Sequence, residues 1–133
     1  MKSKKIDWDK AKQLCEGLTE EQDALTRELV SRIADKWSLW TMAVLAEAGA
    51  ALRFSRVMEH VEGISQKSLT KTLRGLERDG LVTRKVFAEV PPRVEYEITD
   101  FGMVLLDQVA PLWAWVAQSV NMFQHARTKF DRG

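Results

Sequence analysis

Four basic residues recur between positions 65 and 78 at the three- and four-residue spacing of one helical face: Lys67, Lys71, Arg74 and Arg78. Three leucines fall on the opposite face, because each residue turns a helix by about 100°: Leu69, Leu73 and Leu76. No acid interrupts the basic face, although exposed faces usually mix charges of both signs. Such a face suits an anionic partner, and an α-helix fits the major groove of DNA. The alternative is a solvated helix whose charges only aid solubility.

Ser65 and Gly80 set the limits of this helix. The Ser65 hydroxyl can accept a hydrogen bond from the first turn, and Gly80 can adopt the left-handed conformation that closes a helix. Recognition helices contact bases near their N-terminal end. The candidate DNA contacts on the helix are therefore polar residues near its start and the cations that follow, which can bind phosphates or guanine: Ser65, Gln66, Lys67, Ser68, Thr70, Lys71 and Arg74.

A short helix and a tight turn precede the basic helix. Residues 52–54 read as a link, Ser55 can cap a helix that runs to about His60, and Gly63 supplies the turn. Helix, turn, helix is the arrangement in which the second helix enters the groove. Arg53 and Ser55 lie at the start of the first helix, where backbone N–H groups suit a phosphate.

A hairpin is predicted directly after the basic helix. Residues 81–87 are rich in β-forming side chains, and residues 94–98 alternate between apolar and polar. The loop between them, residues 88–93, contains Pro91 and Pro92, which cannot donate to a β-ladder. Such a hairpin is a wing, whose loop can follow the DNA backbone or enter the minor groove. Arg93 is the residue that we expect to make this contact.

Three helices are predicted before this unit. The first covers residues 6–16, and the second opens at Thr19 with Gln22 completing a capping box. The second helix is expected to bury a stripe of three residues: Leu25, Leu29 and Ile33. Asp35 marks a break, and residues 37–48 form a third helix that Gly49 closes.

One long helix is predicted from Thr99 to about Arg127, with a kink at Pro111. Its apolar residues lie on more than one side, so it needs more than one surface to cover them. In so small a protein we expect that surface to be a second copy of the chain. The alternative is that the N-terminal helices cover these faces within one chain.

Composition fits one soluble domain of 133 residues, with 45% hydrophobic and 29% charged side chains. The net charge is only +1, but positions 53–93 hold nine bases and five acids. Positive charge is therefore concentrated where the helix and the wing are predicted. A single cysteine, no membrane-spanning apolar run and no signal peptide after the basic residues 1–5 predict a cytoplasmic protein.

Other chemistry finds little support. The sequence has no glycine-rich phosphate loop, no catalytic triad and no metal-ligand cluster, so we expect neither an enzyme nor a cofactor. His60 has no second histidine or cysteine nearby. Cys15 is expected to be a small buried side chain, with a reactive, redox-active thiol as the alternative.

Six segments resemble the HxlR-type transcriptional regulators, a branch of the MarR-like winged-helix proteins: Lys36-Trp37, residues 52–54, 63–70, 73–82, 90–96 and 98–102. The resemblance covers about residues 35–117. It implies a homodimer, paired through its N- and C-terminal helices, that binds pseudo-palindromic operator DNA and represses or activates nearby genes. It also implies base reading by residues 65–74 and a wing at 89–93. Some members sense oxidants through a cysteine just before the Lys-Trp pair, whereas Cys15 lies 21 residues before Lys36.

The sequence thus predicts an α+β, mostly helical fold: a winged helix-turn-helix domain with a two-stranded wing and terminal dimerisation helices. N-terminal helices occupy residues 1–34, the DNA-binding core 35–99, with recognition helix 65–79 and wing 88–93, and a dimerisation helix and tail 100–133. The predicted partners are double-stranded operator DNA, a second copy and an unidentified small-molecule effector, for which four tryptophans could line a pocket: Trp37, Trp40, Trp113 and Trp115. The alternative function is a winged-helix protein-binding module, with weak, salt-insensitive DNA binding.

Overall fold

The computed structural model describes residues 8–133, which contain seven helices and three strands. The chain divides into two compact units, residues 1–36 and 37–133. Residues 6 and 7, the predicted start of the first helix, and the basic residues 1–5 lie outside the described residues. Each unit is described below by itself.

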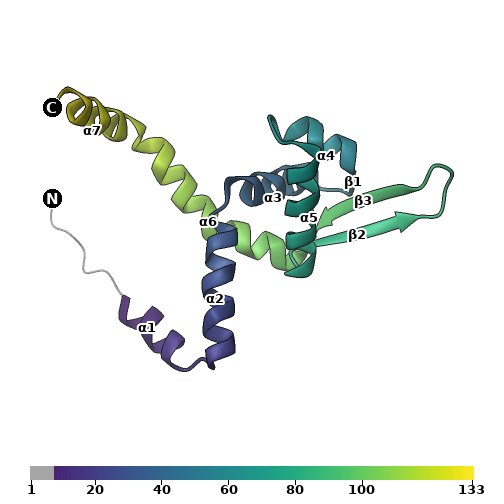
Figure 1. Ribbon diagram of the computed structural model, residues 1–133, viewed down its shortest axis with the longest axis horizontal. Helices are drawn as coiled ribbons and strands as arrows, with labels where there is room; N and C mark the ends of the chain where they lie inside the picture. Colours follow the sequence, from purple (N-terminus) through teal and green to yellow (C-terminus); the bar gives the residue numbers. More distant parts are fainter. Residues whose placement is uncertain (1–7) are drawn as a thin grey trace. The chain divides into compact units, whose positions relative to one another are not determined.

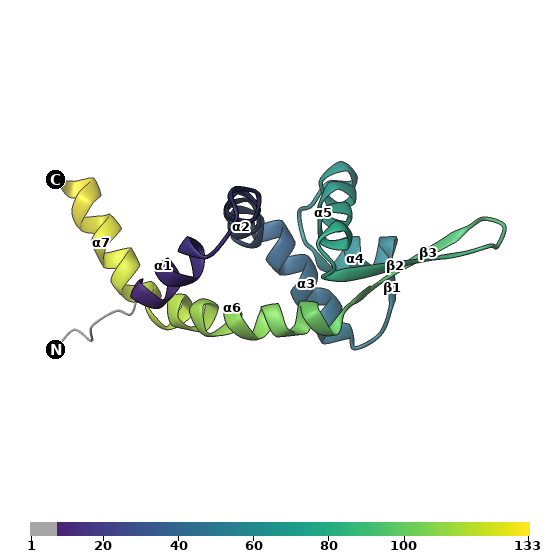
Figure 2. The same cartoon turned by 90° about the horizontal axis from the view of Figure 1, so that it is seen from below.

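The second unit contains a helix-turn-helix followed by a wing (Figure 1). Its helices are α3 (Lys36–Ala48), which begins at the boundary between the units, α4 (Phe54–His60), α5 (Gln66–Arg78), α6 (Asp100–Gln118) and α7 (Val120–Arg132). Its strands are β1 (Leu52–Arg53), β2 (Val82–Phe87) and β3 (Arg93–Ile98). Figures 1 and 2 show the β2–β3 hairpin extending away from the helices. The predicted mostly helical α+β, winged-helix fold is confirmed.

The sheet has three antiparallel strands in the order β1-β3-β2. Residues 52–54 are therefore more than the predicted link, because Leu52 and Arg53 pair with Tyr96 and Glu95 of β3. A two-residue strand has no periodicity of its own, so only its partner strand reveals it. The pairing fixes the start of α4 against the middle of β3.

The core of this unit lies where α3, α4, α5 and the start of β2 meet. Its ten buried apolar residues come from these four elements and from the turns on either side of α5: Met42, Leu45, Val57, Val61, Ile64, Leu69, Leu73, Leu76, Leu81 and Val82. The three leucines predicted on the apolar face of α5 are each at most 1% exposed. The opposite face of the helix is thereby held outward.

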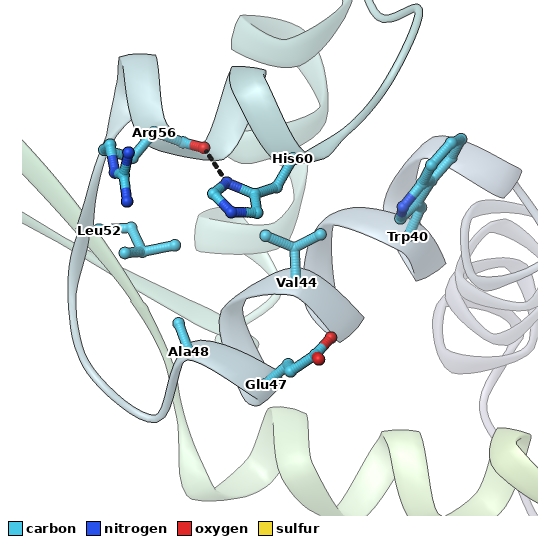
Figure 3. Close-up of a pocket in the computed structure, with 7 residues that line it drawn as sticks. All are labelled: Trp40, Val44, Glu47, Ala48, Leu52, Arg56 and His60. Atoms are coloured by element: carbon cyan, nitrogen blue, oxygen red, sulfur yellow. Dashed lines mark hydrogen bonds between the residues drawn. The ribbon is translucent and has the colours of Figure 1, made fainter.

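The start of α4 differs from the prediction. The helix begins at Phe54, and Arg53 is its N-cap residue without a side-chain capping hydrogen bond. Ser55 is thus not the cap, because the β1–β3 pairing fixes Arg53 in an extended conformation and brings the helix start forward. At the other end, His60 Nδ1 lies 2.8 Å from the carbonyl oxygen of Arg56 (Figure 3). A carbonyl only accepts, so Nδ1 is the donor.

Thr99 and Gly102 join α6 to the end of α5 and the start of β2. The Thr99 hydroxyl donates to the Gly80 carbonyl at 2.8 Å and accepts from the Gly102 N–H at 2.9 Å. The Thr99 N–H donates to the Leu81 carbonyl at 3.0 Å. A Cβ on Gly102 would lie 2.6 Å from Ile98 Cγ1 and closer still to the Leu81 carbonyl oxygen, so only glycine fits there.

The predicted long C-terminal helix is two helices that meet at Ser119. The Ser119 N–H donates to the carbonyls of Trp115 and Val116 and caps α6, after which α7 begins. Ser119, Val120 and Asn121 are weaker helix formers than the residues before them, so a break here costs little. Pro111 lies inside α6 without ending it, and the predicted kink there stays a prediction.

The apolar side chains of α6 and α7 remain largely exposed in the single chain. Eight of them between positions 112 and 130 are 45–84% exposed: Leu112, Trp113, Trp115, Val116, Val120, Met122, Phe123 and Phe130. Trp115 and Phe123 meet edge to face across the Ser119 break, with ring centroids 5.8 Å apart. Among residues 8–133, no helix combines the length and apolar character needed to cross a membrane.

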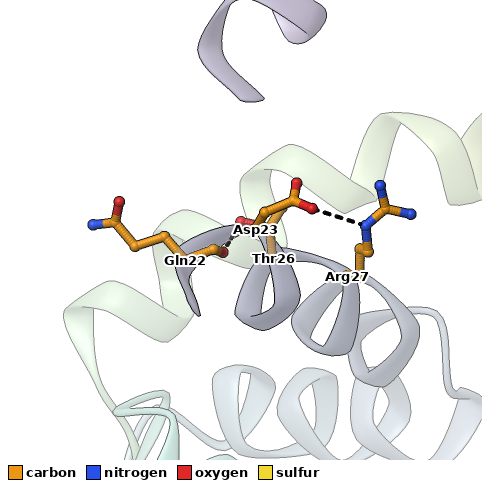
Figure 4. A network of polar contacts seen from close by, with 4 residues as sticks. All are labelled: Gln22, Asp23, Thr26 and Arg27. Carbon is orange, nitrogen blue, oxygen red and sulfur yellow. Dashed lines mark hydrogen bonds and ion pairs between the residues drawn. The ribbon is translucent and has the colours of Figure 1, made fainter. Parts of the chain in front are cut away.

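The first unit contains α1 (Trp8–Glu16) and α2 (Glu20–Ile33). The predicted capping box is confirmed: the Thr19 hydroxyl accepts from the Gln22 N–H, and the Thr19 N–H donates to the Gln22 side chain, both at 3.1 Å. Bonds from Thr26 to the Gln22 carbonyl and from Arg27 to Asp23 follow (Figure 4). The predicted buried stripe is wrong for one chain, since α2 has no buried residue and Leu25 is 49% exposed.

Candidate nucleic-acid interface

Local signals in the sequence fix both ends of α5. Ser65 is the N-cap, and its hydroxyl accepts from the Ser68 N–H at 3.1 Å. Gly80 has a φ of 78°, and its N–H donates to the Glu77 carbonyl at 3.0 Å. Gly63, with a φ of 85°, makes the turn from α4. The predicted helix and its limits are confirmed.

The basic face of α5, defined by Lys67, Lys71, Arg74 and Arg78, points to solvent, and all four side chains are exposed. Within residues 8–133, none of the four forms an ion pair with a carboxylate. Their positive charge is therefore available to an anionic partner. The buried leucines behind them prevent the helix from turning this face inward.

The polar residues at the start of α5 differ in how far their side chains are exposed and in whether these side chains are still free to form hydrogen bonds with DNA. Ser68 is half-buried, and the Thr70 hydroxyl already donates to the Gln66 carbonyl at 2.8 Å. Gln66 is exposed, and its amide forms no hydrogen bond in the part of the chain that the structure describes. An unengaged amide can form two hydrogen bonds to adenine, so Gln66 is the strongest base-reading candidate.

Residues from the start of α4 and from the wing, far apart in sequence, border one open cavity of about 450 Å³. Arg53 and Ser55 form one side, and Glu89, the two prolines and Arg93 form the other. The β1–β3 pairing brings them together, because it places Arg53 opposite Glu95. The structure thus groups three of the sequence-predicted contacts, Arg53, Ser55 and Arg93, beside the wing.

Arg93 is placed differently from the other cations. It lies at the start of β3 rather than in the loop, and its side chain is only 25% exposed. Its guanidinium contacts Glu89 and Glu95 and stacks on the Phe87 ring. The sequence analysis missed these three neighbours, although the pairing of the strands would have placed Phe87 and Glu95 on the same face as Arg93.

The effector pocket that the four tryptophans were predicted to line stays a prediction. Trp40 alone among them borders an open cavity of about 410 Å³ between α3 and α4, with Val44, Glu47, Leu52, Arg56 and His60 (Figure 3). Trp37 instead stacks on Trp40, with ring centroids 6.0 Å apart. Across residues 8–133, no three histidine, cysteine or acidic residues cluster as metal ligands would.

Cys15 is exposed, so the prediction of a buried cysteine is wrong. It lies on α1, a nine-residue helix in which no residue is buried. So short a helix, without apolar cover, cannot bury a small side chain. The thiol is accessible in the single chain, as the alternative prediction requires.

Comparison with known proteins identifies this arrangement. The family model "HxlR-like helix-turn-helix" matches residues 32–124. The chain belongs to this family. The HxlR-like chain is 32% identical over 106 residues to the uncharacterized HTH-type transcriptional regulator YtfH of Escherichia coli (strain K12), covering 80% of this chain and 82% of that protein.

Solved structures of relatives agree with this fold. YtfH from Salmonella typhimurium has a TM-score of 0.69 at 30% identity, with 77% of this chain and 90% of that chain covered. The reduced form of the redox regulator HypR has a TM-score of 0.66 at 30% identity, with 75% and 97% covered. The HxlR-like chain is thus a DNA-binding transcriptional regulator and not an enzyme. The protein-binding alternative is set aside.

Proposed function

We propose that this regulator binds operator DNA as a homodimer in the cytoplasm, with one α5 helix in the major groove of each half-site. The observation that carries the proposal is the basic face of α5, which is exposed and forms no ion pair among the described residues, while the opposite leucine face is buried. A helix held in this way can approach DNA without first breaking internal contacts.

The contacts sort by chemistry. Lys67, Lys71 and Arg74 bind phosphates or guanine, and Gln66 reads a base, with Ser65, Ser68 and Thr70 beside it at the start of the helix. Arg53 and Ser55, at the start of α4, lie beside the loop of the wing and the start of β3, and they bind the DNA backbone next to the wing. The wing flanks the duplex, on the backbone or in the minor groove.

The exposed apolar surface of α6 and α7 supports a dimer. Eight large apolar side chains exposed on two consecutive helices exceed what a monomer usually leaves in water. A second copy that covers the same surface gives a two-fold pair, which matches the two-fold symmetry of an operator with inverted repeats.

The test is binding to DNA from the region upstream of the gene, followed by fluorescence anisotropy. Lys71→Ala should weaken binding and reduce its salt dependence, because each subunit loses a phosphate contact. Lys129→Ala, which removes an exposed lysine from α7, is the matched control and should bind as the wild type does. Equal binding by the wild type and Lys71→Ala would contradict the assignment of α5.

A further inference from the structure

We propose that Arg93 is the clasp of the wing: it holds the β2–β3 hairpin in shape and does not itself bind a phosphate. The inference rests on the proposed function, because it assigns a role within the same interface. The sequence suggests that Arg93 contacts DNA, whereas this proposal assigns it the role of positioning the wing. The wing would then act on DNA through its shape and its other side chains.

The strand register explains why Arg93 has these neighbours. Phe87 pairs with Arg93, and Lys85 pairs with Glu95, across the two strands. Directly opposite residues point to the same face of a sheet, and so do residues two apart on one strand. One face of the wing therefore carries an aromatic ring, a carboxylate and two cations side by side.

The contacts of Arg93 close the hairpin at its loop end. Its Nη1 lies 3.0 Å from Glu89 Oε1, and Glu89 belongs to the loop. Its Nε is buried and lies 3.1 Å from Glu95 Oε2, an ion pair that is not aligned as a hydrogen bond. Its Cζ lies 4.0 Å from the centre of the Phe87 ring. One guanidinium thus joins the loop to both strands.

The charge balance around Arg93 disfavours a phosphate ligand. Two carboxylates already neutralise the guanidinium, and a phosphate at the same place would also face Glu89 and Glu95. Arg93 would have to leave both ion pairs and the aromatic ring to reach DNA. Lys71 and Arg74 have no such partners among the described residues, so they can bind phosphates at no comparable cost.

The competing explanation is that Arg93 does bind a phosphate, and that Glu89 and Glu95 only hold its side chain in the free protein until DNA displaces them. The variants Arg93→Lys and Glu89→Gln separate the two roles. Lysine keeps the positive charge and can still bind a phosphate, but it lacks the planar fork and stacks poorly. Glutamine at position 89 weakens the clasp and also removes a negative charge that would repel DNA.

The experiment measures amide hydrogen exchange of residues 82–98 by NMR in the full chain, together with the slope of log affinity against log salt. For the clasp, Arg93→Lys should speed exchange in the hairpin about fivefold, the loss expected when partly exposed ion pairs and a cation–π contact weaken, and should weaken operator binding. Glu89→Gln should speed exchange and should not tighten DNA binding. Lys71→Ala should leave hairpin exchange unchanged while its salt slope becomes shallower.

Two results would overturn the clasp. The first is hairpin exchange unchanged in Arg93→Lys, with Arg93→Ala lowering the salt slope by the amount expected for lost phosphate contacts. The second is operator binding that tightens in Glu89→Gln together with a salt slope that becomes steeper by the amount expected for a new phosphate contact in each subunit, which would indicate that Arg93 had been released to bind DNA. An unaffected Lys71→Ala would instead contradict the proposed function, so the two failures are distinguishable.

Discussion

The salt dependence of operator binding tests the whole interface. Each subunit presents four exposed cations beside the predicted DNA path that form no ion pair within residues 8–133: Arg53, Lys67, Lys71 and Arg74. Arg78 is left out because it is the last residue of α5, far from the N-terminal end that faces the bases, and lies next to Glu77 and Asp79. A dimer therefore makes about eight phosphate contacts if each cation makes one.

The magnitude follows from the release of counterions. Each phosphate contact contributes about 0.9 to the slope of log affinity against log salt, so the dimer should show a slope of about −7. Raising the salt from about 0.1 to 0.2 M should then weaken binding roughly 100-fold. Lys71→Ala removes one contact from each subunit and should bring the slope to about −5.

Fluorescence anisotropy with a labelled operator between about 0.05 and 0.3 M salt gives the slope directly. If Arg93 also bound a phosphate in each subunit, the slope would steepen to about −9. A slope of about −2 or shallower would refute the interface as described, and so would a slope that Lys71→Ala leaves unchanged.

Three further predictions follow from other parts of the chain. Gly102→Ala should destabilise the protein by about 1–3 kcal/mol in thermal unfolding, because the new methyl group collides with backbone at Leu81; Gly17→Ala, whose Cβ would meet only ordinary contacts from 3.7 Å, should not. Val116→Glu should shift sedimentation toward the monomer, and Glu20→Gln, an exposed change on α2, should sediment as the wild type does. Diamide should change operator affinity in the wild type but not in Cys15→Ser, and an equal response would exclude this thiol.

The parts of the fold that short-range signals specify could be predicted from the sequence. Ser65, the leucine spacing and Gly80 define α5 within a single stretch of chain, and Thr19 with Gln22 does so for the start of α2. Each signal acts between residues at most four apart. The helix that carries the basic face was therefore predictable, together with its exposed side.

The features that were missed depend on contacts distant in sequence. The β1 strand exists only because Leu52 and Arg53 meet β3, and this pairing also moved the start of α4. The break at Ser119 lies within a continuous apolar pattern, so periodicity alone could not locate it. Leu25 belongs to an apolar stripe and is nevertheless exposed in the single chain. An apolar stripe predicts that a surface will be covered, but it does not show which molecule covers it.

The hydrogen bonds from Thr99 to Gly80 and Leu81 tie the start of α6 to the end of α5, so that the two helices move together. In a two-fold dimer paired along α6, the angle at which the two copies cross would therefore set the separation of the two α5 helices. The nineteen residues of α6 span about 28 Å, so a small rotation at the crossing becomes a large displacement at the far end. A molecule that changes this crossing angle would therefore move the two α5 helices away from the spacing that matches the helical repeat of DNA, without contacting α5.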